Sequence, residues 1–369
     1  MNNECPAVFD DLYTSSVGAI VRSQTHYFDD TVRQIIETSV IPKGEPFTVG
    51  DYGSHDGSSS KDILEHLLGA LKQNHGEDLP AHIIYEDTAN NDFNALVKKV
   101  FCNWRESLNH QKVYLSMCPT SFYEQCVPDN TFHVLLSFWS VHFLPSSVSY
   151  KDSLNTFPDG SRAECDAMAA LACDGWQRFL LIRAKEIKSG GCMLLITPAQ
   201  DTDMKYGESR VHLQNLWVAM TTVWRLLRDL KQVTECEYEA ANYPGYYRNE
   251  EELRAPFRDD ASPVVKAGLR IKSLTLSHEK VHILTQRLKD IEQETEDKDD
   301  LESSVSKFVS AIRSWTEYMF MQALSSRSPS SRRDVVNTFY DLLVEHIKQQ
   351  DISTCEWDNV IAYLVITKM

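Results

Sequence analysis

The 369-residue sequence lacks any Lys/Arg-rich stripe interleaved with aromatic residues. Its 37 Lys and Arg residues against 53 Asp and Glu residues give a formal net charge of −16. A surplus of negative charge repels both phosphate backbones and acidic lipid headgroups. We therefore expect no nucleic-acid partner and no binding to a membrane surface.

Long hydrophobic runs are also missing. The longest apolar stretch, Val134–Leu144, is interrupted by Ser137, Ser140 and His142 and is too short to span a bilayer. The first ten residues contain no basic region followed by an apolar run, so we expect no secretory signal. The sequence thus predicts a cytoplasmic protein without a membrane-spanning segment.

The nine cysteines form no CxxC pair, and no Cys/His cluster has the spacing of metal ligands. An odd, scattered set of this kind is typical of reduced thiols in the cytosol. We therefore predict no metal site from these residues. The sequence also contains no obvious pairing of a nucleophile with a general base.

The chain does contain a regular alternation of strand and helix patterns. The strand patterns are mostly continuous apolar runs, which are typical of strands buried on both faces. They cover Phe47–Tyr52, His82–Glu86, Lys112–Met117, Phe132–Ser140, Gly191–Thr197 and Val360–Thr367. Helical patterns between them cover Ser60–Gln73, Asn91–Glu106 and Cys165–Lys188. The alternation predicts a parallel sheet wrapped by helices, with Arg270–Val281 and the last strand closing it in a hairpin-like finish.

The region Asp201–Pro263 does not follow this alternation. It holds a predicted helix, Arg210–Leu230, and an aromatic loop, Asn242–Tyr247, and a further aromatic helix is predicted at Leu301–Ala323. These aromatic residues either form ordinary helix core or belong to a helical cap that lines a hydrophobic substrate pocket.

The residues that could bind a ligand gather at the predicted carboxyl ends of the strands. Asp51 ends the first strand and is followed by a turn with Gly53 and Gly57, which let the backbone approach a ligand closely. Asp87 ends the second strand, where an acidic residue can accept hydrogen bonds from ribose hydroxyls. The alternative for Asp87 is that it caps the helix that follows.

The third and fourth strands end in further candidates. Pro119–Tyr123 offers a hydroxyl and an aromatic ring for an adenine, and Ser137–Leu144 brings large side chains and one imidazole to the same edge. Six collinear motifs, these included, resemble the SABATH family of S-adenosylmethionine-dependent methyltransferases, typified by plant salicylate and jasmonate carboxyl methyltransferases and by caffeine-pathway N-methyltransferases. The matching segments are Asp51–Ser59, Glu86–Asn94, Thr120–Tyr123, Ser137–Leu144, Arg183–Leu195 and Asn242–Tyr246.

The resemblance implies an α/β fold with a Rossmann-like class I methyltransferase sheet, mostly parallel with an antiparallel C-terminal strand, plus an α-helical cap. Residues 1–200 and 264–369 would form the S-adenosylmethionine-binding core. Residues 201–263 would form the cap, and helices within 300–350 are candidates to join it. Relatives also imply a homodimer. A metal near Asn155 and Asn242, where some relatives hold one, is not predicted.

The resemblance also implies which residues contact S-adenosylmethionine. Asp87 would hold the ribose, Thr88 would lie beside the adenine, and Ser121 and Phe122 would flank the adenosine. The full implied set is Tyr27, Thr31, Asp51, Gly53, Ser54, Ser59, Asp87, Thr88, Ser121 and Phe122.

For the methyl acceptor, the resemblance implies contacts from Gln34, Trp139, His142 and Phe143. Gln34 would donate an amide hydrogen to an acceptor carboxylate. In the carboxyl methyltransferases a Trp indole N–H is the second donor, but Phe143 stands at that position and cannot donate. Either His142 or a hydroxyl from elsewhere replaces this donor, or the acceptor is not a carboxylate.

Methyl transfer to a carboxylate needs no general base, because a carboxylate is ionised at pH 7. Positioning and exclusion of water can carry the catalysis, so no catalytic residue is assigned. We predict an O-methyltransferase that converts a small, partly hydrophobic acid to its methyl ester. The alternatives are an N-methyltransferase for a small amine or heterocycle, in which His142 assists proton removal, and a non-catalytic cofactor-binding protein.

Overall fold

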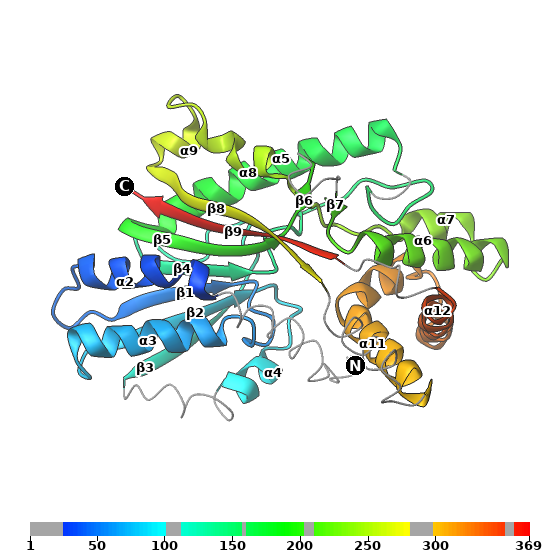
Figure 1. Ribbon diagram of the computed structural model, residues 1–369, viewed down its shortest axis with the longest axis horizontal. Coiled ribbons are helices and arrows are strands. Elements are labelled where there is room, and N and C mark those ends of the chain that lie inside the picture. The colour runs from blue at the N-terminus through cyan, green and yellow to red at the C-terminus, as the bar shows by residue number, and fades with distance from the viewer. Residues whose placement is uncertain (1–24, 101–111, 157–159, 203–209, 281–297, 351–357) are drawn as a thin grey trace.

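The structure is a computed structural model that describes residues 25–100, 112–156, 160–202, 210–280, 298–350 and 358–369 (Figure 1). A seven-stranded sheet in the order β3-β2-β1-β4-β5-β9-β8 forms its centre. The strands are β1 Phe47–Tyr52, β2 Ala81–Asp87, β3 Val113–Pro119, β4 Phe132–Phe138, β5 Ile187–Pro198, β8 Leu269–Lys280 and β9 Asp358–Lys368.

Strands β1 to β5 pair in parallel, and β9 runs antiparallel to both of its neighbours, β5 and β8. The predicted sheet, mostly parallel with an antiparallel C-terminal strand, is therefore confirmed. Strand β5 begins earlier than the predicted Gly191, because Ile187 already pairs with Phe132 before a register shift leads to the pair Val134–Cys192.

Helices cover both faces of the sheet and produce three layers (Figure 1). On one face lie α2 Asp29–Thr38, α3 Lys61–His75 and α4 Phe93–Val97, and on the other lie α5 Arg162–Glu186, α8 Glu250–Arg254 and α9 Pro263–Lys266. Alternate strand residues supply the two cores: Val134 and Leu136 of β4 pack toward the first face, while Leu135 packs toward the second. This explains the continuous apolar runs of the sequence.

Two predicted helices differ from the observed ones. Helix α4 covers Phe93–Val97 of the predicted Asn91–Glu106, residues 98–100 continue it as a π-helical turn, and residues 101–111 lie outside the described part of the chain. The predicted helix at Arg210 begins at Gln214 instead, because the short strand β7 Arg210–Val211 pairs with β6 Gln200–Asp201. The apolar periodicity could not reveal this pairing, because each of the two strands has only two residues.

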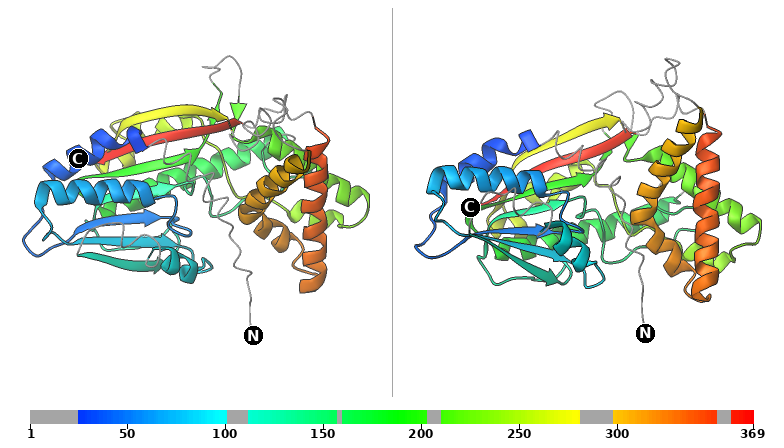
Figure 2. Two further views of the ribbon diagram at one scale, coloured as in Figure 1. Left: turned by 60° about the horizontal axis from the view of Figure 1, so that its bottom comes forward. Right: turned by 90° about the horizontal axis from the view of Figure 1, so that it is seen from below.

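A separate group of helices lies beyond the carboxyl ends of the parallel strands. It contains α6 Gln214–Asp229, α7 Glu235–Ala240, α11 Lys298–Ala323 and α12 Pro329–Lys348, which share one apolar core. Figure 2 shows α11 and α12 standing across this end of the sheet. Within 201–263, only α6 and α7 belong to this group, since α8 and α9 contact β8 and α5. None of the helices in the described ranges is long and apolar enough to cross a membrane.

Candidate functional site

The turn after β1 holds two strand ends together. Gly53 adopts φ +67°, and a β-carbon built on it would lie 2.2 Å from Ser140 Oγ, so both the conformation and the space require glycine. Ser140, which follows β4, donates a 2.9 Å hydrogen bond to the Gly53 carbonyl. Asp51 is buried and accepts a 2.5 Å bond from Ser60 Oγ, and burial raises its pKa to about 7.

Asp87, the last residue of β2, keeps room for a ligand. Its carboxylate accepts hydrogen bonds from the backbone N–H groups of His55 (2.8 Å) and Thr88 (2.7 Å). Two carboxylate oxygens offer about four acceptor positions, so capacity remains for two hydroxyls. Helix α4 is capped by Asp92, and the interpretation of Asp87 as its cap is therefore wrong.

Two polar atoms beside this turn test whether a nucleoside cofactor suits it. Ser54 Oγ and Glu86 Oε1 are buried, and neither has a hydrogen-bond partner within the described ranges. The Gly53 N–H donates to the other Glu86 oxygen at 3.1 Å, and burial raises the pKa of Glu86 to about 9. A polar ligand at this edge would satisfy orphaned groups that otherwise cost free energy. The residues present therefore fit S-adenosylmethionine.

The remaining predicted adenosine contacts lie around the same edge. Ser59 is half-buried in the turn, while Thr88 is exposed. Ser121 follows β3, and its Oγ accepts a 3.2 Å bond from the Tyr123 N–H. The ring of Phe122 packs edge-on against Phe179 of α5, at a centroid distance of 5.8 Å.

Tyr27, which precedes α2, and the residues of α2 itself lie at different places along the sheet. Tyr27 stacks on Tyr363 with ring centroids 4.3 Å apart, close to the carboxyl end of β5. Thr31 Oγ1 and Gln34 Oε1 instead accept bonds from Lys272 Nζ at 3.1 Å and 2.6 Å. Lys272 lies on β8 at the level of Met193, well before β5 ends.

The structure thus does not bring Gln34 together with the other predicted acceptor residues. Gln34 is exposed on the outer side of α2, whose buried side carries Val32, Ile35 and Ile36. Thr31 is buried but shares the contact with Lys272, so it also lies away from the strand ends. The helix runs back along the sheet from Tyr27, and each turn carries its residues further from the edge.

Trp139, His142 and Phe143 do lie together after β4. Trp139 adopts φ +61°, and its buried indole Nε1 has no hydrogen-bond partner in the described parts of the chain. His142 is buried, its Nε2 lies 2.9 Å from the Tyr243 hydroxyl, and burial holds its pKa well below the usual value. The Phe143 ring lies against the imidazole, with centroids 4.2 Å apart.

Three further residues, His212, Tyr243 and Tyr247, complete this group. His212 lies 5.8 Å from Trp139 and 5.2 Å from Tyr247, between ring centroids, and Tyr247 lies 5.9 Å from His142. We call Trp139, His142, His212, Tyr243 and Tyr247 the aromatic cluster. The Tyr residues belong to the aromatic loop noted in the sequence, whereas no sequence signal marked His212.

Both imidazoles of the aromatic cluster are neutral near pH 7. Burial lowers the pKa of His212 to about 3 and that of His142 well below 6.5. Each has a buried Nδ1 for which the described residues supply no hydrogen-bond partner. The aromatic cluster therefore presents three unsatisfied nitrogens, from Trp139, His142 and His212, without a positive charge.

Asn242, considered above for a metal site, has a structural role. Its Oδ1 accepts a 2.9 Å bond from the Tyr150 N–H, and its Nδ2 donates a 2.7 Å bond to the Glu239 carbonyl. Asn155 is also buried. Within the described ranges, no group of three or more His, Cys, Asp or Glu side chains is placed to hold a metal ion.

Comparison with known proteins finds relatives that are named as methyltransferases of carboxylic acids. Arabidopsis thaliana farnesoic acid carboxyl-O-methyltransferase is 28% identical over 178 residues, which are 44% of this chain and 48% of that protein. Loganic acid O-methyltransferase from Catharanthus roseus is 23% identical over 224 residues, 57% of each chain. The matches thus span roughly half the length of these curated relatives.

A solved structure extends the likeness to the whole fold. Loganic acid methyltransferase with SAH superposes with a TM-score of 0.73 at 17% identity, covering 98% of this chain and 97% of that one. The model of the family described as SAM dependent carboxyl methyltransferase matches residues 15–369. The chain belongs to the family of SAM dependent carboxyl methyltransferases.

Proposed function

We propose that this protein transfers a methyl group from S-adenosylmethionine to the carboxylate of a small, partly hydrophobic acid and releases the methyl ester. The observation that carries the proposal is the buried indole N–H of Trp139, which has no partner among the described residues and whose ring lies 5.8 Å, between centroids, from neutral His212. A carboxylate oxygen is the acceptor that such a donor lacks, and a hydrogen bond to a charged acceptor contributes about 1.5–3 kcal/mol.

The proposed cofactor contacts are those at the strand ends. Asp87 accepts the ribose hydroxyls, and Ser54 Oγ and the turn at Gly53 border the same edge. The set consists of Tyr27, Asp51, Gly53, Ser54, Ser59, Asp87, Thr88, Ser121 and Phe122. The contact of Thr31 with Lys272 argues for leaving this residue out. When bound, S-adenosylmethionine supplies an electrophilic methyl group on its sulfonium sulfur.

The proposed acceptor contacts replace the indole N–H donor that is missing at Phe143. Trp139 Nε1 replaces the missing indole, four residues earlier in the chain. If the Tyr243 hydroxyl donates to His142 Nε2, the imidazole carries its proton on Nδ1 and becomes a second donor. Gln34, paired with Lys272, is not needed in this arrangement.

Neutral donors suit the chemistry of the transfer. They orient the carboxylate without the tight ion pair that a Lys or Arg would form, so its oxygen stays nucleophilic. The aromatic cluster excludes water, and alignment of oxygen, methyl carbon and sulfur then supplies several kcal/mol of the barrier reduction. No side chain needs to remove a proton, because the acceptor is already ionised.

The family model favours this carboxylate acceptor over a nitrogen acceptor and over a non-catalytic binding protein. A neutral nitrogen nucleophile would release a proton, and His142 would have to take it. The low pKa of this buried imidazole makes it a weak base at neutral pH.

The test is a methyl-transfer assay over a library of small acids and amines, with rates measured from pH 6 to pH 8. We expect methyl esters, a rate that is flat over this range at saturating S-adenosylmethionine, and only a modest loss for His142→Ala. Methylated amines and a crippled His142→Ala variant would establish N-methylation. Cofactor binding without any product would instead establish the non-catalytic alternative.

We also propose that the protein is a homodimer in the cytoplasm. The resemblance of the six motifs supports the dimer, and the six described cysteines, all free thiols, support a reducing compartment. Light scattering coupled to size-exclusion chromatography tests the first proposal, since one chain has a mass of 42.2 kDa. Imaging of the full-length fusion in cells tests the second.

A further inference from the structure

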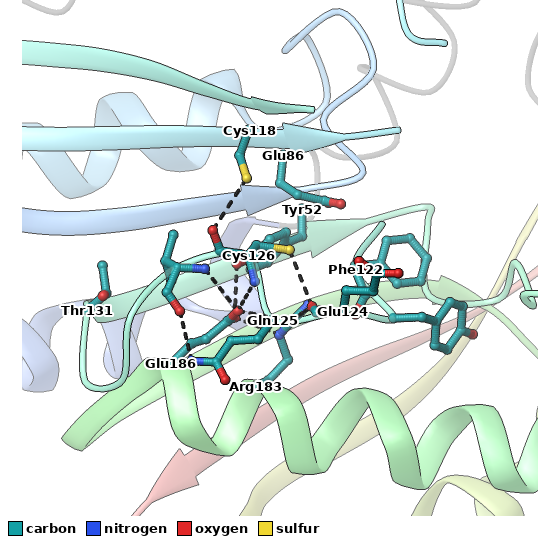
Figure 3. A network of polar contacts seen from close by, with 12 residues as sticks. Tyr52, Glu86, Cys118, Phe122, Glu124, Gln125, Cys126, Thr131, Arg183 and Glu186 are labelled. Atoms are coloured by element: carbon teal, nitrogen blue, oxygen red, sulfur yellow. Dashed lines mark hydrogen bonds and ion pairs between the residues drawn. The ribbon is translucent and has the colours of Figure 1, made fainter. Parts of the chain in front are cut away.

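The last turn of α5 carries a fully buried ion pair that the proposed function does not use. Arg183 Nε lies 2.8 Å from Glu186 Oε2, and both side chains have zero exposure (Figure 3). The two residues belong to the segment Arg183–Leu195, one of the six motifs of the sequence. A buried ion pair is weak evidence for stability, because desolvation of both charges offsets their attraction. Its contacts indicate a different role.

Arg183 binds the loop that follows β3. Its Nη1 donates to the Phe122 carbonyl at 2.8 Å, and its Nη2 donates to the Glu124 carbonyl at 2.7 Å. The planar guanidinium fixes both donors in one fork, so it sets the direction of the backbone that carries Ser121 and Phe122. These are the two proposed adenosine contacts.

Glu186 binds the other end of the same loop and the turn after β1. Its Oε1 accepts from the Cys126 N–H at 2.6 Å, and its Oε2 accepts from the Tyr52 hydroxyl at 2.9 Å (Figure 3). The Arg183 guanidinium also lies over the Tyr52 ring, 4.5 Å from its centroid. Tyr52 stands between Asp51 and Gly53, so the pair contacts both segments of the proposed cofactor site.

We propose that Arg183 and Glu186 are positioning residues that fix the loop 119–127 against the turn at Tyr52 and thereby set the affinity for the cofactor. The inference rests on the proposed function, because it takes these two segments as the cofactor site. Neither side chain touches the cofactor in this arrangement. Arg183 acts through the carbonyl of Phe122, and Glu186 acts through Tyr52, which adjoins Asp51 and Gly53, and through Cys126 at the other end of the loop.

The experiment compares Arg183→Lys and Glu186→Gln with the wild-type enzyme. Lys keeps the charge but cannot reach two carbonyls as a fork, and Gln keeps the shape but loses an anionic acceptor. We expect the calorimetric Kd for S-adenosylhomocysteine to rise about tenfold or more in each variant. The KM for the acid should stay within about twofold, and amides of residues 119–127 should exchange hydrogen faster.

The chain contains a matched control pair. Arg327 Nε and Nη2 each lie 2.6 Å from Glu237, and Nη2 also donates to the Gln232 carbonyl at 2.8 Å, but all three residues lie in the helical group. Arg327→Lys and Glu237→Gln should lower the melting temperature without changing the Kd for S-adenosylhomocysteine.

The experiment distinguishes failure of the positioning role from failure of the proposed function. Variants of Arg183 and Glu186 that melt earlier but bind S-adenosylhomocysteine like the wild type would overturn the positioning role and leave the proposed function intact. A wild-type protein that does not bind S-adenosylhomocysteine would overturn both. If a single variant fails to fold, the double variant Arg183→Met/Glu186→Met removes both buried charges together. Wild-type affinity in this double variant would also overturn the proposal.

Discussion

The turn region at the ends of β1 and β2 and the aromatic cluster after β4 lie at the same edge of the sheet but are built differently. The turn region consists of consecutive short segments whose backbone N–H groups bind Asp87 and Glu86. The aromatic cluster is assembled from residues 139–142, His212 and residues 243–247, which are far apart in sequence. One region binds through local backbone geometry, and the other through side chains gathered by the fold.

This difference explains why the methyl donor is easier to predict than the acceptor. A glycine turn and an acid after two neighbouring strands form a recognisable local pattern, and parallel strands bring them together in almost any sheet of this type. The aromatic cluster has no such pattern. Its shape depends on how α6 and the loop 242–247 pack against the end of β4.

The largest expected effect is on cofactor binding by the turn region. Asp87→Ala should weaken binding of S-adenosylhomocysteine about 100-fold, because two hydrogen bonds to a carboxylate are lost. Isothermal titration calorimetry measures this change. The matched control is Asp92→Ala, which removes only the cap of α4 and should cost about 1 kcal/mol of stability. Equal affinities of the two variants would contradict the role of Asp87.

The next effect belongs to the aromatic cluster. Trp139→Phe keeps an aromatic six-membered ring but removes the N–H donor, so kcat/KM for the acid should fall about tenfold while the Kd for the cofactor stays unchanged. Its melting temperature should fall only by the lost packing of the second ring, because the lost donor has no partner within the described ranges. Trp224→Phe is the control: its Nε1 donates to the Tyr238 carbonyl, so it should lose stability and keep kcat/KM. The opposite pattern would refute the acceptor role of Trp139.

A third prediction concerns the pH dependence of the turn region. Burial raises the pKa of Glu86 from 4.5 to about 9, so between these values the folded state holds a proton that the unfolded state has released. The free energy of unfolding therefore falls as pH rises through this window. Glu86→Gln should melt at a higher temperature relative to the wild type as pH increases from 5 to 9, measured by calorimetry.

Glu237→Gln serves as the control for this slope. Arg327 lowers the pKa of Glu237 to about 2, so its contribution to stability is complete above pH 4.5 and is lost only as pH falls toward 2. Its melting curve should therefore run parallel to that of the wild type between pH 5 and pH 9. A parallel curve for Glu86→Gln as well would contradict the buried, protonated carboxyl.

The smallest expected effect tests the placement of α2. Gln34→Ala should change kcat/KM for the acid by less than about twofold, because Gln34 is exposed and contacts Lys272 away from the strand ends. Steady-state kinetics at saturating cofactor measure this ratio. A loss of tenfold or more would restore Gln34 to the acceptor site and would remove the need for Trp139 as the replacing donor.

The sequence predicted the sheet well because its strands carry their own signal. The bounds of β1 were predicted to the residue, and those of β4 within two, since continuous apolar runs end sharply where the chain reaches the edge. Boundaries failed where pairing rather than composition decides them, at Ile187 in β5 and at Arg210 in β7. The helical group was only partly predictable, because α8 and α9 differ from α6 and α7 in packing and not in pattern.

The sequence by itself determined the family and the donor of the methyl group, because both rest on short segments with fixed local geometry. Only the tertiary structure decided that Gln34 lies with Lys272, that Arg183 and Glu186 hold the loop after β3, and that His212 joins Trp139. These contacts join residues separated by more than 50 positions, and they depend on the packing of whole elements. No local pattern in the chain records that packing.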